Sequence, residues 1–131
     1  MCLDIYIRGE LKKCSTKDLI KKYRKVAKDD ITVYKSMINM GNGKLLSFYR
    51  GKEYEIGYWY YQTGNFSKQF GIKRYPNFIS ISTGLHSYKT PNMFFTGVRC
   101  TIPKGSIYFE GNDGDIVSNN LIIEGILNHR I

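Results

Sequence analysis

Residues 79–89 concentrate polar side chains of the kinds that bind ligands or take part in catalysis. The segment supplies Ser82, Thr83, His86, Ser87 and Tyr88. Gly84 lies among them and permits a sharp turn, so that these groups would be presented at one end of a sheet. His86 is a candidate general base, but the sequence shows no partner for a catalytic triad, and a hydrogen-bonded structural histidine is the alternative.

Basic residues elsewhere would supply charge for an anionic ligand. Arg50 and Arg99 carry guanidinium groups, whose planar fork matches phosphate oxygens better than an ammonium group does. Lys104 lies in an Ile-Pro-Lys-Gly-Ser turn, where it and the neighbouring backbone N–H groups are candidates for holding a phosphate. The spacing is not that of a P-loop, and an ordinary β-turn with a solvated lysine is the alternative.

The densest aromatic cluster occupies residues 54–61. On a strand, Tyr58 and Tyr60 would face one side of the sheet, and Trp59 and Tyr61 the other. One face must contribute to the core, and the other is able to stack on a base or an adenine ring. Tyr60 and Tyr88 are therefore the candidate stacking residues, while ordinary core packing is the alternative.

Several kinds of site are not supported by the sequence. Three widely spaced cysteines without a Cys-x-x-Cys pair predict neither a zinc site nor a disulfide framework. Two histidines are too few for a metal centre. The acidic residues 110–115 lack the spacing of a calcium loop and indicate a hairpin loop instead. We therefore expect neither a metal nor a cofactor.

The elements that must position these groups follow from the periodicity of apolar residues. Ser15 and Thr16 offer an N-cap, and apolar residues on one helical face predict a single lysine-rich helix over residues 16–28. Alternation predicts a short strand at 2–8 and about seven later ones: 31–37, 44–50, 53–61, 78–83, 98–102, 107–109 and 121–127. Residues 62–77 and 110–115 are expected to form loops, and residues 90–96 a short helical or irregular piece. The expected fold is α+β, with a mainly antiparallel sheet of about seven strands and one early basic amphipathic helix.

Length, charge and composition indicate the number of domains and the general class of the protein. The chain has 131 residues and a formal charge of +9, which fits one domain, 1–131, that attracts polyanions. Its aromatic content is too high for a disordered chain, and no apolar run is long enough to span a membrane. Without the pattern of a secretory signal, a cytoplasmic protein with reduced thiols and no membrane partner is expected. The oligomeric state is not indicated.

Five segments resemble, in order, the core of the ADP-ribosyltransferases. They are Val33-Tyr-Lys35, Tyr49-Arg-Gly51, Ile81-Ser-Thr-Gly84, residues 98–106 and residues 121–127. The resemblance covers about residues 31–127 and implies that Arg50 or Lys35 takes the place of the family's first-strand basic residue, and Ser82-Thr83 that of its Ser-Thr motif. Where the family carries Glu-x-Glu, this chain reads Val117-Ser-Asn-Asn120, and only Glu124 follows. The sequence is also similar to small phage and prophage proteins with Leu-His-Ser and Ile-Pro-Lys-Gly-Ser patterns.

The leading hypothesis is a phage-type accessory protein, acting against a host defence signal in the host cytoplasm, that binds a nucleotide-class anion without catalysis. The first alternative is an ADP-ribosyltransferase that uses NAD, with Glu124 as its catalytic carboxylate. Another is a nucleic-acid-binding protein that uses the lysine helix and the tyrosines, which predicts binding that weakens steeply with salt. An inhibitor of an acidic host protein is the last.

Overall fold

The computed structural model describes residues 2–47, 51–91 and 96–127, in which every paired strand is antiparallel to its neighbour. A small sheet has the order β1 (Leu3–Tyr6), β8 (Phe78–Ile81), β7 (Ile72–Arg74). The large sheet has the order β2 (Lys25–Val26), β11 (Ile107–Glu110), β12 (Asp115–Ser118), β9 (Leu85–Tyr88), β3 (Ile31–Gly41), β10 (Thr96–Ile102), β13 (Asn120–Ile126), β6 (Trp59–Tyr61). Two further strands extend it beside β3, namely β4 (Lys44–Ser47) and β5 (Glu53–Glu55).

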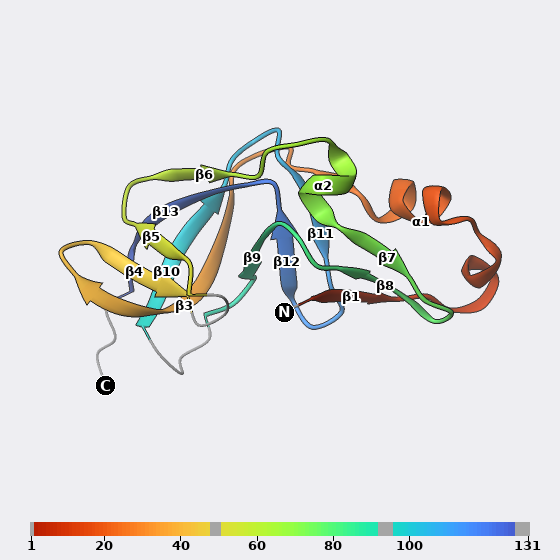
Figure 1. Ribbon diagram of the computed structural model, residues 1–131, viewed down its shortest axis with the longest axis horizontal. Helices are drawn as coiled ribbons and strands as arrows, with labels where there is room; N and C mark the ends of the chain where they lie inside the picture. Colours follow the sequence, from red (N-terminus) through yellow and green to blue (C-terminus); the bar gives the residue numbers. More distant parts are fainter. Residues whose placement is uncertain (1, 48–50, 92–95, 128–131) are drawn as a thin grey trace.

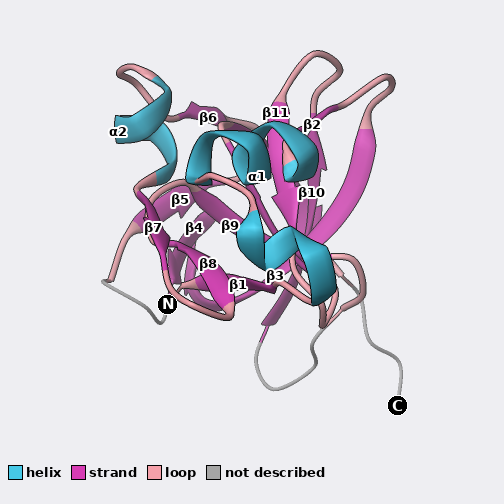
Figure 2. Cartoon of the chain, turned by 90° about the vertical axis from the view of Figure 1, so that its right-hand side faces the viewer, coloured by secondary structure: helices cyan, strands magenta, loops and turns pink. Residues whose placement is uncertain are grey.

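The helices gather around the small sheet. They are the 3₁₀ helix η1 (Gly9–Lys13), α1 (Thr16–Tyr23) and α2 (Phe66–Phe70). Figure 1 shows α1 at the right-hand end and α2 nearer the middle, beside β7, while β3, β10, β13 and β6 curl together at the left. Figure 2, seen from the α1 end, places η1 and α1 nearest the viewer. No helix of the described chain is long and apolar enough to cross a membrane.

The expected fold class is confirmed, since the protein is α+β with mainly antiparallel sheet. The expected number of about seven strands is wrong, because the described residues alone form thirteen. The strands expected around residues 31–37, 78–83, 107–109 and 121–127 are present as β3, β8, β11 and β13.

Two hydrophobic cores lie on opposite faces of the middle of the large sheet. The first fills the curled part and includes Val33, Met37 and Cys100, all fully buried. The second lies between the large sheet, the small sheet and the helices, and includes Leu19 and Phe70. We call the face of the large sheet that lines the first core the inner face, and its opposite the outer face.

The basic helix is shorter than expected and ends at Tyr23 rather than at residue 28. Its N-cap is as predicted, because the Ser15 side chain accepts a hydrogen bond from the Asp18 N–H at 3.2 Å. Arg24 leaves the helical conformation, and Lys25 and Val26 then pair with β11. The apolar residues expected to continue the helical face lie in or directly after β2 instead. Val26 is exposed on the strand, and Ala27, which follows it, is buried in the first core.

Residues 62–77 are not simply a loop, because they contain α2 and β7. Asn65 caps α2 by accepting the Lys68 N–H at 3.0 Å, and Gly71 ends the helix in the left-handed conformation, with φ +54°. The expected strand 53–61 is also divided into β5 and β6, with Gly57 in the turn at φ +88°. Two short strands, β9 and β12, were not predicted from the sequence.

Candidate functional site

A lysine lies among the hydrophobic residues of the inner face. Along β3, Val33, Lys35 and Met37 share one face because strand side chains alternate, and Val33 and Met37 are fully buried core residues. The β3–β10 register places Val98, another buried residue, directly opposite Lys35. Lys35 is thus a charged residue at a position that the strand reserves for apolar side chains.

The Lys35 ammonium group makes two contacts with other described residues. Its Nζ donates a hydrogen bond to the backbone carbonyl oxygen of His86 on β9 and lies 5.4 Å from the ring centre of Tyr54. Although the side chain keeps part of its surface accessible, desolvation by the surrounding protein lowers its pKa to about 8. None of the ion pairs among the described residues includes Lys35.

A second lysine approaches the same tyrosine. Lys52 Nζ lies 5.1 Å from the ring centre of Tyr54 and 5.7 Å from that of Tyr60. The two rings meet edge to face, with their centres 4.8 Å apart. Desolvation lowers the pKa of Lys52 as well, and the two lysine charges repel each other. We call Lys35, Lys52, Tyr54 and Tyr60 the lysine–tyrosine cluster.

Two other titratable groups of this face, Tyr54 and Cys100, stay neutral near pH 7. Desolvation raises the pKa of the Tyr54 hydroxyl and that of the Cys100 thiol to about 12. For Cys100, the nearby Lys35 opposes this rise and Glu124 adds to it. Tyr60 is held by a hydrogen bond in which its hydroxyl oxygen accepts the Glu55 N–H at 2.7 Å. The cluster therefore carries positive charge beside the neutral hydroxyl group of Tyr54.

A buried hydroxyl group lies beside Lys35. Tyr34 on β3 pairs with Tyr88 on β9, and continuing this antiparallel register by one residue sets Ser87 opposite Lys35. Ser87 is fully buried, and its Oγ has no hydrogen-bond partner among the described residues. A buried hydroxyl without a partner costs about 1–3 kcal/mol. Such a group is poised to bind a ligand atom that reaches it.

Replacing Ser87 with alanine is expected to leave the ligand-free protein as stable as the wild type or up to about 1 kcal/mol more stable, because an unsatisfied group is removed. Ser118 is the matched control: it is equally buried, but its Oγ donates to the Asn120 carbonyl oxygen at 2.9 Å. Ser118→Ala should cost about 1 kcal/mol. Urea denaturation measures both; equal losses in the two variants would contradict an unsatisfied Ser87.

Other residues predicted to bind the ligand lie on the outer face. The registers of β9, β3 and β10 set Tyr88, Tyr34 and Arg99 side by side in one row. His86 lies on the same side of β9 as Tyr88, opposite Val117 of the second core. His86 therefore contributes only its backbone carbonyl to the lysine–tyrosine cluster, while its ring faces the other way.

Ser82 and Thr83 lie at the junction of α2 with the two sheets. The Ser82 Oγ donates to the carbonyl oxygen of Gly71 at 3.1 Å, and the Thr83 N–H donates to that of Phe70 at 3.1 Å. A Cβ atom at Gly71 would lie 2.7 Å from both hydroxyl oxygens. In this position the two residues hydrogen-bond to the carbonyl groups at the C-terminal end of α2.

Lys104 lies near the β2 edge. Its backbone N–H donates to the Asp30 carboxylate at 2.8 Å, while the Gly105 and Ser106 N–H groups donate to the carbonyl oxygens of Ala27 and Pro103. The N–H groups proposed to hold a phosphate are therefore already engaged within the protein.

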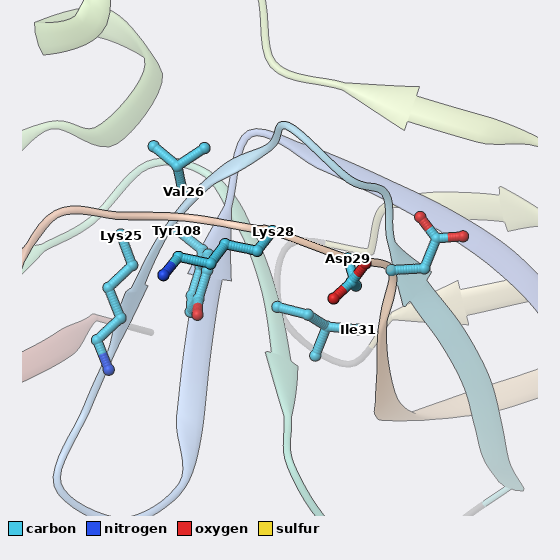
Figure 3. A pocket seen from close by; sticks show the side chains of 7 residues that line it. Lys25, Val26, Lys28, Asp29, Ile31 and Tyr108 are labelled. Atoms are coloured by element: carbon cyan, nitrogen blue, oxygen red, sulfur yellow. The ribbon is translucent and has the colours of Figure 1, made fainter.

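A pocket of about 490 Å³ opens beside β2 and the start of β3 (Figure 3). It is lined by Lys25, Val26, Lys28, Asp29, Asp30, Ile31 and Tyr108. Two lysines and two aspartates line it together, and Lys25 also lies 3.9 Å from Glu110. With both signs of charge in its wall, this pocket is less suited to an anion than the lysine–tyrosine cluster is.

The segment that replaces the Glu-x-Glu motif has structural roles. Ser118 is buried, and the Asn119 side-chain oxygen accepts the Ile107 N–H at 2.9 Å. Glu124 is exposed on β13, where the register with β10 shifts between Arg99 and Cys100. These amides and hydroxyl groups hold the β12–β13 connection together.

The structure thus divides the predicted site. Tyr60 and Ser87 lie on the inner face with Lys35, whereas Arg99, Tyr88 and the His86 ring are on the outer face. Arg50 lies outside the described residues. Lys52 and Tyr54 were missed as site residues. The available signal was Lys35, a charged residue at an inward position of an alternating strand. Among the described residues, no group of three or more potential metal ligands comes together.

Comparisons with protein-family models, with curated proteins and with solved structures gave no match for this chain.

Proposed function

We propose that this protein binds an anionic, nucleotide-class ligand at the lysine–tyrosine cluster, without catalysing a reaction on it. One observation carries the proposal. The ammonium groups of Lys35 and Lys52 converge on the ring of Tyr54, and neither takes part in an ion pair within the described part of the chain.

The energetics of burial support an anion as the missing partner. Desolvating a charged lysine without a counterion is unfavourable, which is why buried charges in proteins are normally paired. An anionic oxygen near both ammonium groups would compensate for the desolvation of Lys35 and reduce its repulsion by the more exposed Lys52. The unsatisfied hydroxyl of Ser87 would add a hydrogen bond.

The tyrosines favour a ligand that also has an aromatic or sugar part. Tyr60 is half-buried on the inner face, and its neighbours Trp59 and Tyr61 on β6 are 57% and 67% exposed. Aromatic rings stack on bases, and lysines bind phosphate groups. Nucleotides combine both features in one molecule.

The resemblance to ADP-ribosyltransferases supplies the ligands to test first, namely ADP-ribose and NAD. The transferase alternative depends on Glu124 as the catalytic carboxylate, and this residue is exposed on β13. Binding without catalysis therefore fits the chain better than transfer does. A phage-type protein of this kind would act by sequestering a host nucleotide signal.

The direct test is thermal unfolding with ADP-ribose, NAD or a cyclic dinucleotide, each added separately. A ligand present at 100 times its Kd stabilises the folded state by about 2.7 kcal/mol, which should raise Tm by about 10 °C for a chain of this size. Adenosine, which has no charge, should give no shift. If none of the three anions raises Tm, the proposal is overturned.

A matched pair of variants ties the binding to the cluster. Lys52→Met removes one charge from beside Tyr54 and should weaken binding about 10- to 100-fold, since hydrogen bonds to charged groups contribute about 1.5–3 kcal/mol. Lys21→Met removes an exposed charge from α1, at the far end of the molecule (Figure 1). Equal losses in the two variants would show that net charge, rather than this site, binds the ligand.

A further inference from the structure

Lys35 has the surroundings of a reactive amine. One of its N–H groups is held by the His86 carbonyl oxygen, which fixes the position of the nitrogen atom. The side chain rises from β3 between two fully buried residues, and part of its surface remains accessible. Once the nitrogen loses a proton, its lone pair is not needed for any contact within the described structure.

The groups that face Lys35 favour the neutral amine. Lys52, which precedes β5, adds like charge, while Tyr54 on β5 and Cys100 on β10 stay protonated near neutral pH. Burial lowers the pKa of Lys35 to about 8, so that about half of its side chains are neutral at pH 8. At pH 7 the neutral fraction is roughly 300-fold larger than for a lysine with the ordinary pKa of 10.5.

We propose that Lys35 forms an imine with anionic ligands that carry an aldehyde group, such as the open-chain form of a sugar phosphate. This inference rests on the proposed function, because Lys52 would hold the anionic group of the same ligand. The ring of Tyr54 and the hydroxyl of Ser87 would flank the carbonyl group, and the Ser87 Oγ would donate a hydrogen bond to the carbonyl oxygen.

The reaction is balanced without any further reactant. The lone pair of Lys35 Nζ attacks the carbonyl carbon, and a carbinolamine forms. A carbon–nitrogen double bond then replaces the carbon–oxygen bond, and the oxygen leaves as water with the two protons of the amine. The reverse reaction with water releases the aldehyde, so that the ligand is held reversibly.

Pyridoxal 5′-phosphate is a suitable probe, because it is an anionic aldehyde. The full-length protein is incubated with it, the imine is reduced with borohydride, and the labelled lysines are identified by peptide mass spectrometry. We expect Lys35 to be labelled at least about ten times faster than Lys21, with a half-maximal rate near pH 8. Pyridoxal, which lacks the phosphate, should label Lys35 more slowly.

Variants separate this chemistry from simple binding. Lys35→Met should lose the fast label while circular dichroism shows that it is folded, and Lys52→Met should keep the label but form it about ten times more slowly. Even labelling of the exposed lysines would overturn the imine proposal.

A comparison with ADP, which has no aldehyde, separates the two proposals. If ADP raises Tm but Lys35 is not labelled, the imine proposal fails and the proposed function stands. If Lys35 is labelled and no nucleotide raises Tm, the imine is supported and the nucleotide assignment fails.

Discussion

Lys35→Met is expected to stabilise the ligand-free protein by about 2 kcal/mol at pH 7 and to abolish its binding of anions. Methionine keeps most of the apolar stem of the lysine and removes the charge that burial disfavours. A pKa lowered from 10.5 to about 8 sets an upper limit of about 3 kcal/mol. The expected value is smaller because the side chain is partly exposed.

The pH dependence of this difference identifies its cause. Below about pH 8, Lys35 is protonated in both the folded and the unfolded protein, and the full penalty is present. Between pH 8 and 10.5 the unfolded chain still holds the proton that the folded protein has lost. The free energy of unfolding of the wild type therefore rises with pH relative to that of the variant, and the difference between the two shrinks. Above pH 10.5 the charge contribution to the difference is gone.

Other groups on the inner face change wild-type stability in the opposite direction. The pKa values of Cys100 and Tyr54 are raised to about 12, so that both ionise first in the unfolded chain and stability falls as pH rises above about 9. The difference between wild type and Lys35→Met cancels the Tyr54 contribution because both proteins contain it. The Cys100 contribution differs only through the charge of Lys35, which lowers the Cys100 pKa in the wild type. Urea denaturation from pH 7 to 10 measures it; a difference that does not shrink with pH would contradict a buried charge.

Gly84→Ala is expected to lower the free energy of unfolding by at least about 3 kcal/mol. The residue joins β8 to β9 with φ +118°, a conformation that side chains rarely adopt, and a Cβ there would lie 2.4 Å from Val117 Cγ2. Backbone strain of this kind costs about 1–3 kcal/mol, and overpacking a core costs about as much again. Val117 cannot move away freely, because it is fully buried in the second core.

Gly43→Ala is the matched control for the strain alone. Gly43 has φ +76°, and nothing lies within 4 Å of a Cβ built on it. Its replacement should cost about 1–2 kcal/mol in the same urea experiment. If the two alanine variants are destabilised equally, the contact with Val117 contributes nothing to the cost of Gly84→Ala.

The strands with clear alternation could be predicted from the sequence because one face of each is buried. β3 and β8 are of this kind, with Val33 and Met37 on one face of β3 and Ile79 and Ile81 on one face of β8. β12 was missed because Asp115, at its start, extends an acidic turn-like run. The end of α1 was misplaced because Val26 and Ala27 suit either a helix or a strand, and pairing with β11 decides between them.

The candidate site could be predicted only in part, since neighbours along a strand point to opposite faces. His86, Ser87 and Tyr88 looked like one polar group in the sequence, but only Ser87 lies on the inner face. Lys52 and Tyr54 approach Lys35 through the pairing of β4 with β3 and β5, a contact between segments that no local pattern specifies.

The strand β12 belongs to both cores at once. Its neighbouring residues Ile116 and Val117 are buried in the first and the second core, respectively. On β11, Tyr108 packs against the first core and its neighbour Phe109 is buried in the second. Neither core can therefore be lost while the other stays intact, and the chain cannot be cut into two fragments that each keep a complete interior. Folding couples the curled end of the large sheet to the helical end as a single cooperative unit.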